Sequence, residues 1–345
     1  NFKKEKSFIT IRGVKLEKLG ICIPDELNAH EILKLATLAD EAGLHSVWKT
    51  EDYYFRDGIS LLSAVAVHTK NVKIGVDVIN PYTRNPALIA MSAATIDEVS
   101  NGRFILGMGS STEVWIEEQM GIRLGKRLTV LKETVEAIRK ILSGDLVNFE
   151  GKEVKLRNIR LGFKPYRKNI PIYLAAVGPK MLQLAGGVAD GVILTAASSP
   201  KYIRDFAMEN LKIGMEKSGK KIEQIDICCN IIFSLSEDSK KAKELAKMMT
   251  GLCLSIPEYG DLIMEKSGMD KDLLIPIRQC LKKGDVHLMR RYVTDEMIDI
   301  FTISGTKKEC EDKFFEYKKA GIKTPLLMPV SDYKEVIGFC ATLNP

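Results

Sequence analysis

Two adjacent carboxyl groups lie in a segment whose composition suits catalysis. Glu51 and Asp52 follow an expected strand at 45–50, and aromatic residues stand beside them at 48 and 53–55. Paired acids that are buried together can retain a proton at neutral pH, although a solvated loop is the commoner setting for such a pair. The neighbouring rings favour a wall for a planar ligand. Glu51 and Asp52 are therefore candidates for proton transfer.

Two glycine-containing turns could bring backbone amides close to an anionic ligand. The turn at 107–112 (GMGSST) includes Gly109 and Ser110, and a tight exit from a strand explains it equally well. The turn at 175–180 (AAVGPK) ends a strand and opens a helix with proline in its first turn. Free amides at a helix N-terminus suit a phosphate, although ordinary capping uses the same residues. Gly178 allows close approach, and Thr195 could add a hydroxyl.

A regular alternation of elements predicts how these segments are positioned. Short β-branched runs each precede a segment with apolar residues at helical spacing, which is typical of βα units and a parallel sheet. The helices are expected at 28–42, 58–68, 86–100, 127–142, 179–188, 200–218, 306–320 and 332–343. The strands are expected at 19–24, 45–50, 72–79, 103–109, 172–177, 191–195, 227–233 and 324–330.

Eight such strands predict a closed (β/α)8 TIM barrel, with a doubly wound open sheet as the runner-up. We expect residues 1–17 to be an N-terminal appendage and residues 18–345 to form a single barrel. Residues 144–169 leave the pattern, with a short hairpin near 150–151. Residues 237–298 read as a helical insertion after the seventh strand, because they are too long for an ordinary connection. In a barrel, the chemistry belongs at the carboxyl ends of the strands.

The composition narrows the classes of function. The net charge of +6 is scattered, which argues weakly for an anionic ligand and weakly against nucleic acid. Seven cysteines without a CxxC pair suggest a reducing cytoplasm, and no apolar run reaches the roughly 20 residues of a membrane span. Four histidines without ligand spacing give a metal centre little support. No GxSxG elbow or phosphate-gripping lysine motif supports a hydrolase or an NTPase.

Three separated motifs carry a resemblance to a known family. They are VINPYTRNP at 78–86, ATIDEVSNGRFILGMG at 94–109 and IPIYLAAVGPKMLQLAGGVADG at 170–191. In this order they resemble the luciferase-like superfamily, and the greatest similarity is to the coenzyme F420-dependent methylenetetrahydromethanopterin reductases. The resemblance covers about residues 18–235 and 302–330. It implies a bacterial-luciferase type of barrel with the deazaflavin ring in its mouth.

The resemblance also assigns binding residues. It implies a non-prolyl cis peptide bond between Asp77 and Val78 that supports the ring, and such bonds persist only where the surrounding structure enforces them. The phosphate tail would lie between the fourth and sixth strands, and Arg84 could help to attract it. The positions that match the cofactor-binding residues are Thr50, Asp77, Val78, Gly109, Ser110, Ala176, Val177, Gly178 and Thr195.

The acids of the family are only partly retained. Glu51 and Asp52 stand in place of an Asp-His pair, so the histidine is missing. Cys22 replaces a glutamate on the first strand, and a thiol is a poor substitute acid. Glu113, after the fourth strand, could supply a carboxylate. We therefore expect Glu51, Asp52, Glu113 and Cys22 near the reacting atoms.

The expected function is an oxidoreductase that transfers a hydride between coenzyme F420 and a small organic substrate, such as a methylenetetrahydromethanopterin-like compound. Two alternatives stay open: an FMN-dependent luciferase-like monooxygenase, and a non-catalytic cofactor-binding relative. The resemblance further implies a homodimer or a larger homo-oligomer. The charge pattern and the lack of a long apolar run predict neither nucleic acid nor a membrane as partner. No metal is expected.

Overall fold

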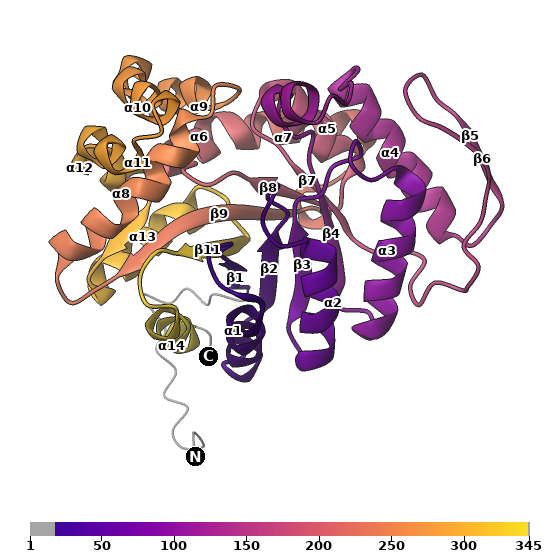
Figure 1. The fold of residues 1–345 in the computed structure, drawn as a ribbon, viewed down its shortest axis with the longest axis horizontal. Helices are drawn as coiled ribbons and strands as arrows, with labels where there is room; N and C mark the ends of the chain where they lie inside the picture. Colours follow the sequence, from indigo (N-terminus) through magenta and orange to yellow (C-terminus); the bar gives the residue numbers. More distant parts are fainter. Residues whose placement is uncertain (1–17, 344–345) are drawn as a thin grey trace.

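The predicted strands are present, and they close into a parallel barrel (Figure 1). The computed structural model describes residues 18–343. Each strand pairs with the next in parallel, and β9 closes the barrel by pairing with both β8 and β11. The predicted (β/α)8 fold is confirmed. The barrel strands are β1 Gly20–Ile23, β2 Ser46–Thr50, β3 Lys73–Asp77, β4 Phe104–Met108, β7 Ile172–Ala175, β8 Gly191–Leu194, β9 Asp226–Leu235 and β11 Thr324–Pro329.

Helices surround the barrel, and local residues explain where they begin. Asn28 accepts a hydrogen bond from the amide of Glu31, and the Glu31 carboxylate accepts one from the amide of Asn28, which caps α1. Asn85 caps α3, whose first residue is Pro86. The surrounding helices are α1 Ala29–Glu41, α2 Gly58–His68, α3 Pro86–Val99, α4 Arg127–Leu142, α5 Pro179–Val188, α6 Pro200–Tyr202, α7 Met208–Ser218, α13 Lys307–Lys319 and α14 Tyr333–Leu343.

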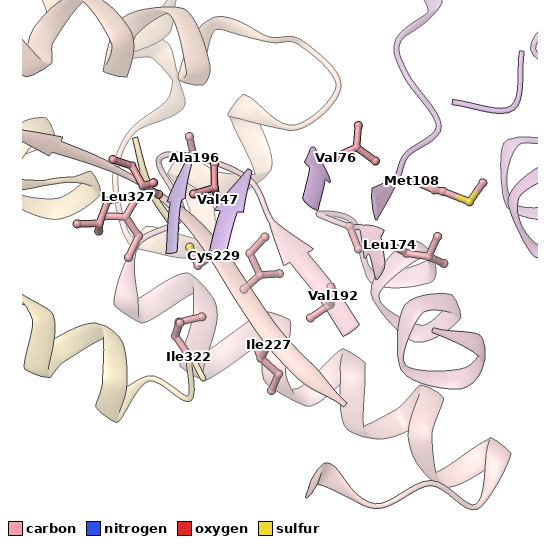
Figure 2. Packing of buried hydrophobic residues seen from close by; sticks show 14 of the residues in the cluster. Val47, Val76, Met108, Leu174, Val192, Ala196, Ile227, Cys229, Ile322 and Leu327 are labelled. Carbon is pink, nitrogen blue, oxygen red and sulfur yellow. The ribbon is translucent and has the colours of Figure 1, made fainter. Parts of the chain in front are cut away.

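Alternating side chains along each strand build two separate cores. On β2, Val47 joins a large outer cluster that also contains helix residues such as Ile32, whereas the next residue, Trp48, joins a small inner cluster. Figure 2 shows part of the outer cluster, including Val47. Inside the barrel, Trp48 and Tyr173 lie with ring centroids 5.9 Å apart. The barrel is therefore filled below its carboxyl end.

Two additions interrupt the repeat, as predicted. The first is an antiparallel hairpin of β5 Val147–Glu150 and β6 Lys155–Ile159, at the edge of the molecule outside α4 (Figure 1). The second is a group of helices after β9, which lies on the opposite side of Figure 1. These helices are α8 Ser239–Ser255, α9 Gly260–Ser267, α10 Leu274–Lys282, α11 Val286–Met289 and α12 Asp295–Phe301, with short 3-10 turns η5 Lys271–Leu273 and η6 Arg290–Tyr292.

Some details differ from the sequence-based expectations. The expected helix at 200–218 contains a π-helical turn, η3 Ile203–Ala207, and a second one, η2 Val114–Gln119, occupies the loop after β4. A 3-10 turn, η4 Ile222–Gln224, precedes β9. An additional strand, β10 Ile303–Gly305, pairs with the end of β9, which extends beyond the barrel. With three residues, β10 is too short to show a pattern.

The expected appendage at 1–17 lies outside the described residues. Within residues 18–343, the structure contains no helix with both the length and the apolar character needed to cross a membrane. All seven cysteines lie in this range, and each has a free thiol.

A buried ion pair fastens the segment after the hairpin to the barrel. Arg167 Nε donates to both carboxylate oxygens of Asp97 at 3.0 Å, and Arg167 Nη2 donates to the carbonyl of Phe104 at 2.7 Å. The Asp97 side chain is fully buried. This pair joins residue 167 to both α3 and β4.

Removing the Arg167 cation is expected to destabilise the fold. Arg167→Met leaves the Asp97 carboxylate buried without its partner, so we expect the free energy of unfolding to fall by about 3 kcal/mol. Arg157→Met is the matched control, because Arg157 pairs with Glu150 at 3.9 Å on the exposed hairpin. That variant should lose less than about 1 kcal/mol. Urea denaturation checks both values, and equal losses would contradict the assignment.

Candidate active site

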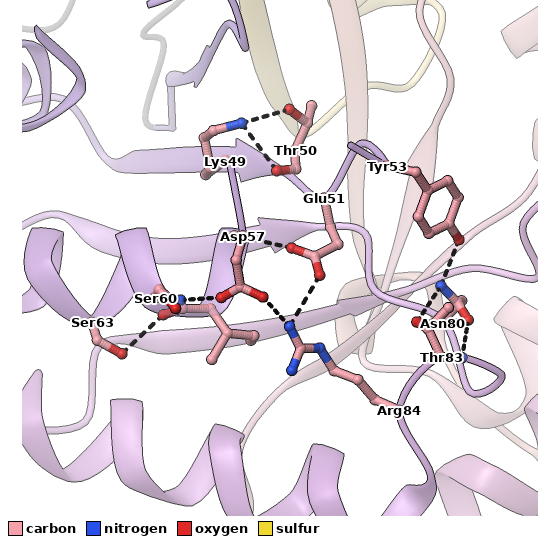
Figure 3. Close-up of polar contacts among 12 residues, drawn as sticks. Lys49, Thr50, Glu51, Tyr53, Asp57, Ser60, Ser63, Asn80, Thr83 and Arg84 are labelled. Carbon is pink, nitrogen blue, oxygen red and sulfur yellow. Dashed lines mark hydrogen bonds and ion pairs between the residues drawn. The ribbon is translucent and has the colours of Figure 1, made fainter. Parts of the chain in front are cut away.

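The carboxyl ends of β1 and β2 bring a lysine and an unpredicted aspartate together. The Lys49 side chain is 1% exposed and forms an ion pair with Asp25, which lies between β1 and α1. Thr50 Oγ1 donates to Asp25 Oδ2 at 2.6 Å, and Lys49 Nζ donates to Thr50 Oγ1 at 3.0 Å. The contact of Lys49 with Thr50 is drawn in Figure 3. Both oxygens of Asp25 therefore accept hydrogen bonds from donors on β2.

Asp52 lies beside this pair, and its pKa is raised well above the ordinary carboxyl value. Burial is the main cause that raises the pKa of Asp52 to about 8, and the hydrogen bond with Asp25 and the charge of Asp25 raise it further. The charge of Lys49 opposes this shift. At neutral pH the Asp52 carboxyl is mostly in its acid form.

A third carboxyl, Asp77 at the end of β3, is bonded across the barrel. Asn230 Nδ2 on β9 donates to Asp77 Oδ2 at 2.6 Å, and Cys22 Sγ on β1 lies 3.8 Å from the same oxygen. Burial raises the pKa of Asp77 to about 6. Burial, followed by the charge of Asp77, raises the pKa of the Cys22 thiol well above its usual value. Cys22 is therefore a neutral neighbour of Asp77 at neutral pH.

The peptide bond between Asp77 and Val78 is cis, as the resemblance implies. The Val78 side chain projects toward the end of β4, where a Cβ on Gly109 would lie 2.7 Å from Val78 Cγ2. The amide of Gly109 donates to the carbonyl of Ile79 at 2.9 Å. Glycine at 109 therefore leaves the space that Val78 occupies, and Ser110 follows it half-buried.

The predicted phosphate loop follows β7. Gly178 is the N-cap of α5, and no side chain caps the helix there. A Cβ built at Gly178 would have no other atom of the described residues within 4 Å, apart from its chain neighbours and its own helix. Tyr202 Oη donates to the carbonyl of Val177 at 2.7 Å, and the amide of Ala176 donates to Ile193. Gly178 and the first amides of α5 are therefore available to a ligand.

Thr195 connects this side of the barrel to the helical insertion. It follows β8, and its side chain hydrogen-bonds Tyr259, which precedes α9. The charge of Asp52 contributes to raising the pKa values of both Tyr259 and Cys253, for which burial is the main cause. Residues 253–259 therefore approach the acidic residues and Thr195 from above the barrel.

Glu51 and Arg84 form an ion pair. Glu51 Oε2 accepts from the amide of Gly58 at the start of α2, and Arg84 Nη2 lies 3.3 Å from Glu51 Oε1. Figure 3 shows Arg84 between Glu51 and Asp57, with which it forms a second ion pair. Glu51 therefore has a cationic partner, Arg84, whose charge is balanced by Glu51 and Asp57 together. Glu113 is exposed before η2 and makes no capping bond.

The aromatic wall expected near 48–55 is formed chiefly by Tyr53. Its hydroxyl accepts from Asn80 Nδ2 at 2.5 Å and donates to Ser111 Oγ at 2.9 Å, and its ring meets Trp115 edge-on at 5.0 Å. Tyr54, in contrast, is 75% exposed. Tyr53 therefore ties together the loops after β2, β3 and β4.

Sequence reasoning missed Asp25, Lys49 and Asn230, although each carries a recognisable signal. Asp25 directly follows a predicted strand, and Lys49 and Asn230 are polar residues inside predicted strands. Asn230 is 8% exposed, and its Oδ1 atom finds no hydrogen-bond partner within residues 18–343. That buried acceptor indicates a missing donor. In the same part of the chain, no three His, Cys, Asp or Glu side chains are grouped to hold a metal.

The fold and the arrangement of this site define a luciferase-like barrel. The family model described as "Luciferase-like monooxygenase" matches residues 18–324, and the chain belongs to this family. The 5,10-methylenetetrahydromethanopterin reductase of Archaeoglobus fulgidus is 36% identical over 309 residues, which cover 88% of this chain and 91% of the relative.

Two further comparisons extend this result. The F420-dependent glucose-6-phosphate dehydrogenase of Amycolatopsis mediterranei is 32% identical over 243 residues, covering 67% of this chain and 73% of that protein. The solved structure of the coenzyme F420-dependent tetrahydromethanopterin reductase of Methanopyrus kandleri superimposes with a TM-score of 0.87 at 28% identity, covering 96% of this chain and 99% of that one. Similarity therefore extends along the whole barrel.

A pair of glycine variants distinguishes packing from open space at this site. In Gly109→Ala the new methyl group collides with Val78, and we expect the free energy of unfolding to fall by about 1–3 kcal/mol. In Gly178→Ala the methyl group meets no described atom, and the backbone at φ −75° suits alanine. Its stability should stay within about 1 kcal/mol. Thermal and urea unfolding measure the difference, and a reversed order would contradict this packing.

Proposed function

We propose that this protein is an F420-dependent oxidoreductase that transfers a hydride between the deazaflavin and a small organic substrate similar to methylenetetrahydromethanopterin. Its F420-dependent relatives span most of the chain. The single observation that carries the proposal is the arrangement at the end of β3, where Asp77 accepts a hydrogen bond from Asn230 and Val78 packs against Gly109. The non-catalytic alternative is less favoured, because Asp52 retains a titratable proton at the same place.

The residues at the barrel mouth fit such a cofactor. Val78 and Gly109 would support the ring, and the buried Oδ1 of Asn230 offers an acceptor for a donor on a ligand. The open position at Gly178 and the first amides of α5 would hold the phosphate. The other residues proposed to bind are Thr50, Asp77, Ser110, Ala176, Val177 and Thr195. When bound, coenzyme F420 supplies or accepts the hydride.

The chain itself has to orient the substrate, exclude water and manage the proton. Of the four acids proposed from the sequence, Asp52 has the most suitable environment, because it is buried and protonated at neutral pH. Cys22 acts through Asp77, to which it is hydrogen-bonded. Glu51 and Glu113 would serve at the edge of the site, since Glu51 is paired with Arg84 and Glu113 is exposed.

The substrate would enter beneath the helical insertion. Residues 253–259 lie near both Asp52 and Thr195, so they would form the wall opposite the ring. Because this wall belongs to the insertion and not to the repeated barrel units, we propose that it determines which substrate is accepted.

Cofactor binding provides the first test of the proposed function. We expect oxidised F420 to bind more tightly than FMN in fluorescence titrations. Gly178→Ala should weaken F420 binding roughly tenfold, about 1.4 kcal/mol, because its methyl group occupies the space offered to the phosphate. Its unchanged stability provides the control. Preferential binding of FMN would favour the monooxygenase alternative, and hydride transfer is then measured with reduced F420 and a methylenetetrahydromethanopterin acceptor.

We also propose that the protein is a cytoplasmic homodimer or larger homo-oligomer. Apolar side chains are exposed along neighbouring helices, with Val67 on α2 at 72% and Leu88, Met91 and Val99 on α3 at 42–46%. Such a stripe is typical of an interface. Its seven free thiols suit a reducing compartment. Light scattering should give at least twice the mass of 38.5 kDa, and Met91→Lys should lower it. A monomeric parent protein would contradict the proposal.

A further inference from the structure

The Asp25–Asp52 contact has an asymmetry that decides which group carries the proton. Two hydrogen-bonded carboxyl groups require one proton between them, since two carboxylates would repel each other. Asp25 already accepts from Lys49 and from Thr50, one donor on each oxygen. Both donors favour the ionised form of Asp25. The proton therefore lies on Asp52, which donates it to Asp25.

The other groups that face Asp52 do not change this assignment. Burial raises the pKa values of the thiols and phenols around it, so they remain neutral at pH 7. The Lys49 ammonium thus faces the carboxyl groups of Asp25, Asp52 and Asp77. Its charge is balanced by Asp25, with which it forms an ion pair. The groups facing Asp52 are Asp25, Asp77, Lys49, Cys22, Cys253, Tyr53 and Tyr259.

We propose that Asp25 is a positioning residue that keeps the proton on Asp52, and that Asp52 delivers this proton to the substrate. The delivery step rests on the proposed function. The pair would replace the glutamate that Cys22 displaces on β1 and the histidine that is missing after β2. Asp25 reaches the site from the loop after β1, three residues beyond Cys22.

The proposed step balances protons and electrons. A new C–H bond forms with the hydride from the reduced cofactor, and the π electron pair of the attacked carbon moves to its nitrogen or oxygen neighbour. The O–H bond of Asp52 breaks, and its proton binds that neighbour. Asp52 is then a carboxylate beside Asp25, and it regains the proton that the dihydro cofactor loses along with the hydride. The substrate gains two hydrogens, and the cofactor loses two.

Carboxyl titration of the cofactor-free protein tests the pair without any activity measurement. With aspartates labelled at the carboxyl carbon, NMR should show one group with a midpoint near pH 8, and Asp52→Asn should remove that signal. In Asp25→Asn the negative neighbour is gone, so the midpoint should fall by ~1 pH unit or more. Glu26→Gln, an exposed neighbour in the same loop, is the control and should leave it in place.

The reaction supplies an independent readout. In the parent protein, kcat for reduction should fall above about pH 8 as Asp52 loses its proton. Asp25→Asn should move this fall to lower pH by the same amount, with KM changing less than kcat, and Asp25→Glu should restore part of the profile. A purely structural role would lower kcat equally at every pH.

Two results would overturn the inference. If Asp52 titrates in the ordinary carboxyl range, or if its midpoint is the same in Asp25→Asn, then Asp25 does not hold the proton there. If the titration behaves as expected but no acceptor is reduced, the proposed function and the delivery step both fail, and the pairing itself stands. The two failures are therefore distinguishable.

Discussion

One buried ammonium has to compensate three carboxyl groups at the carboxyl end of the barrel, and this imbalance governs the site. Among these three carboxyl groups, Lys49 forms an ion pair with Asp25. Within residues 18–343, Asp52 and Asp77 form no ion pair, so burial favours their acid forms and raises both pKa values. Proton retention is therefore a consequence of the architecture, because adding a second cation would abolish it.

Asp77 also belongs to the surface on which a ligand would rest. Asp77 and Asn230 lie on strands 153 residues apart in sequence, and their hydrogen bond crosses the barrel above the layer that holds Trp48. Immediately after Asp77, the Val78 side chain packs against Gly109. A planar ligand seated against Val78 would thus rest on a surface supported by both sides of the barrel.

The strands and helices could be predicted from the sequence, but the contacts among the charged residues of the site could not. Strands and helices follow local rules, such as the β-branched residues of β8 or the cap at Asn28, so eight strands and the hairpin could be predicted from local patterns. The cis bond was predictable only through the family resemblance. The positions of Asp25 and Asn230 mark them as unusual, but their partners lie 25 and 153 positions away, so the sequence does not identify the contacts that they make.

The raised pKa values also explain why such a site needs a firm scaffold. An aspartate whose pKa is higher in the folded protein than in the unfolded chain binds more protons when folded, so stability falls as pH rises from about 4 toward the folded value. For Asp52 this window extends to about pH 8, and for Asp77 to about pH 6. At neutral pH the folded protein therefore bears much of this cost. Buried contacts far from the mouth, including the Arg167–Asp97 pair and the outer core around Val47, have to offset it. The stability of the barrel and the acidity of its mouth are thus coupled through the same buried carboxyl groups.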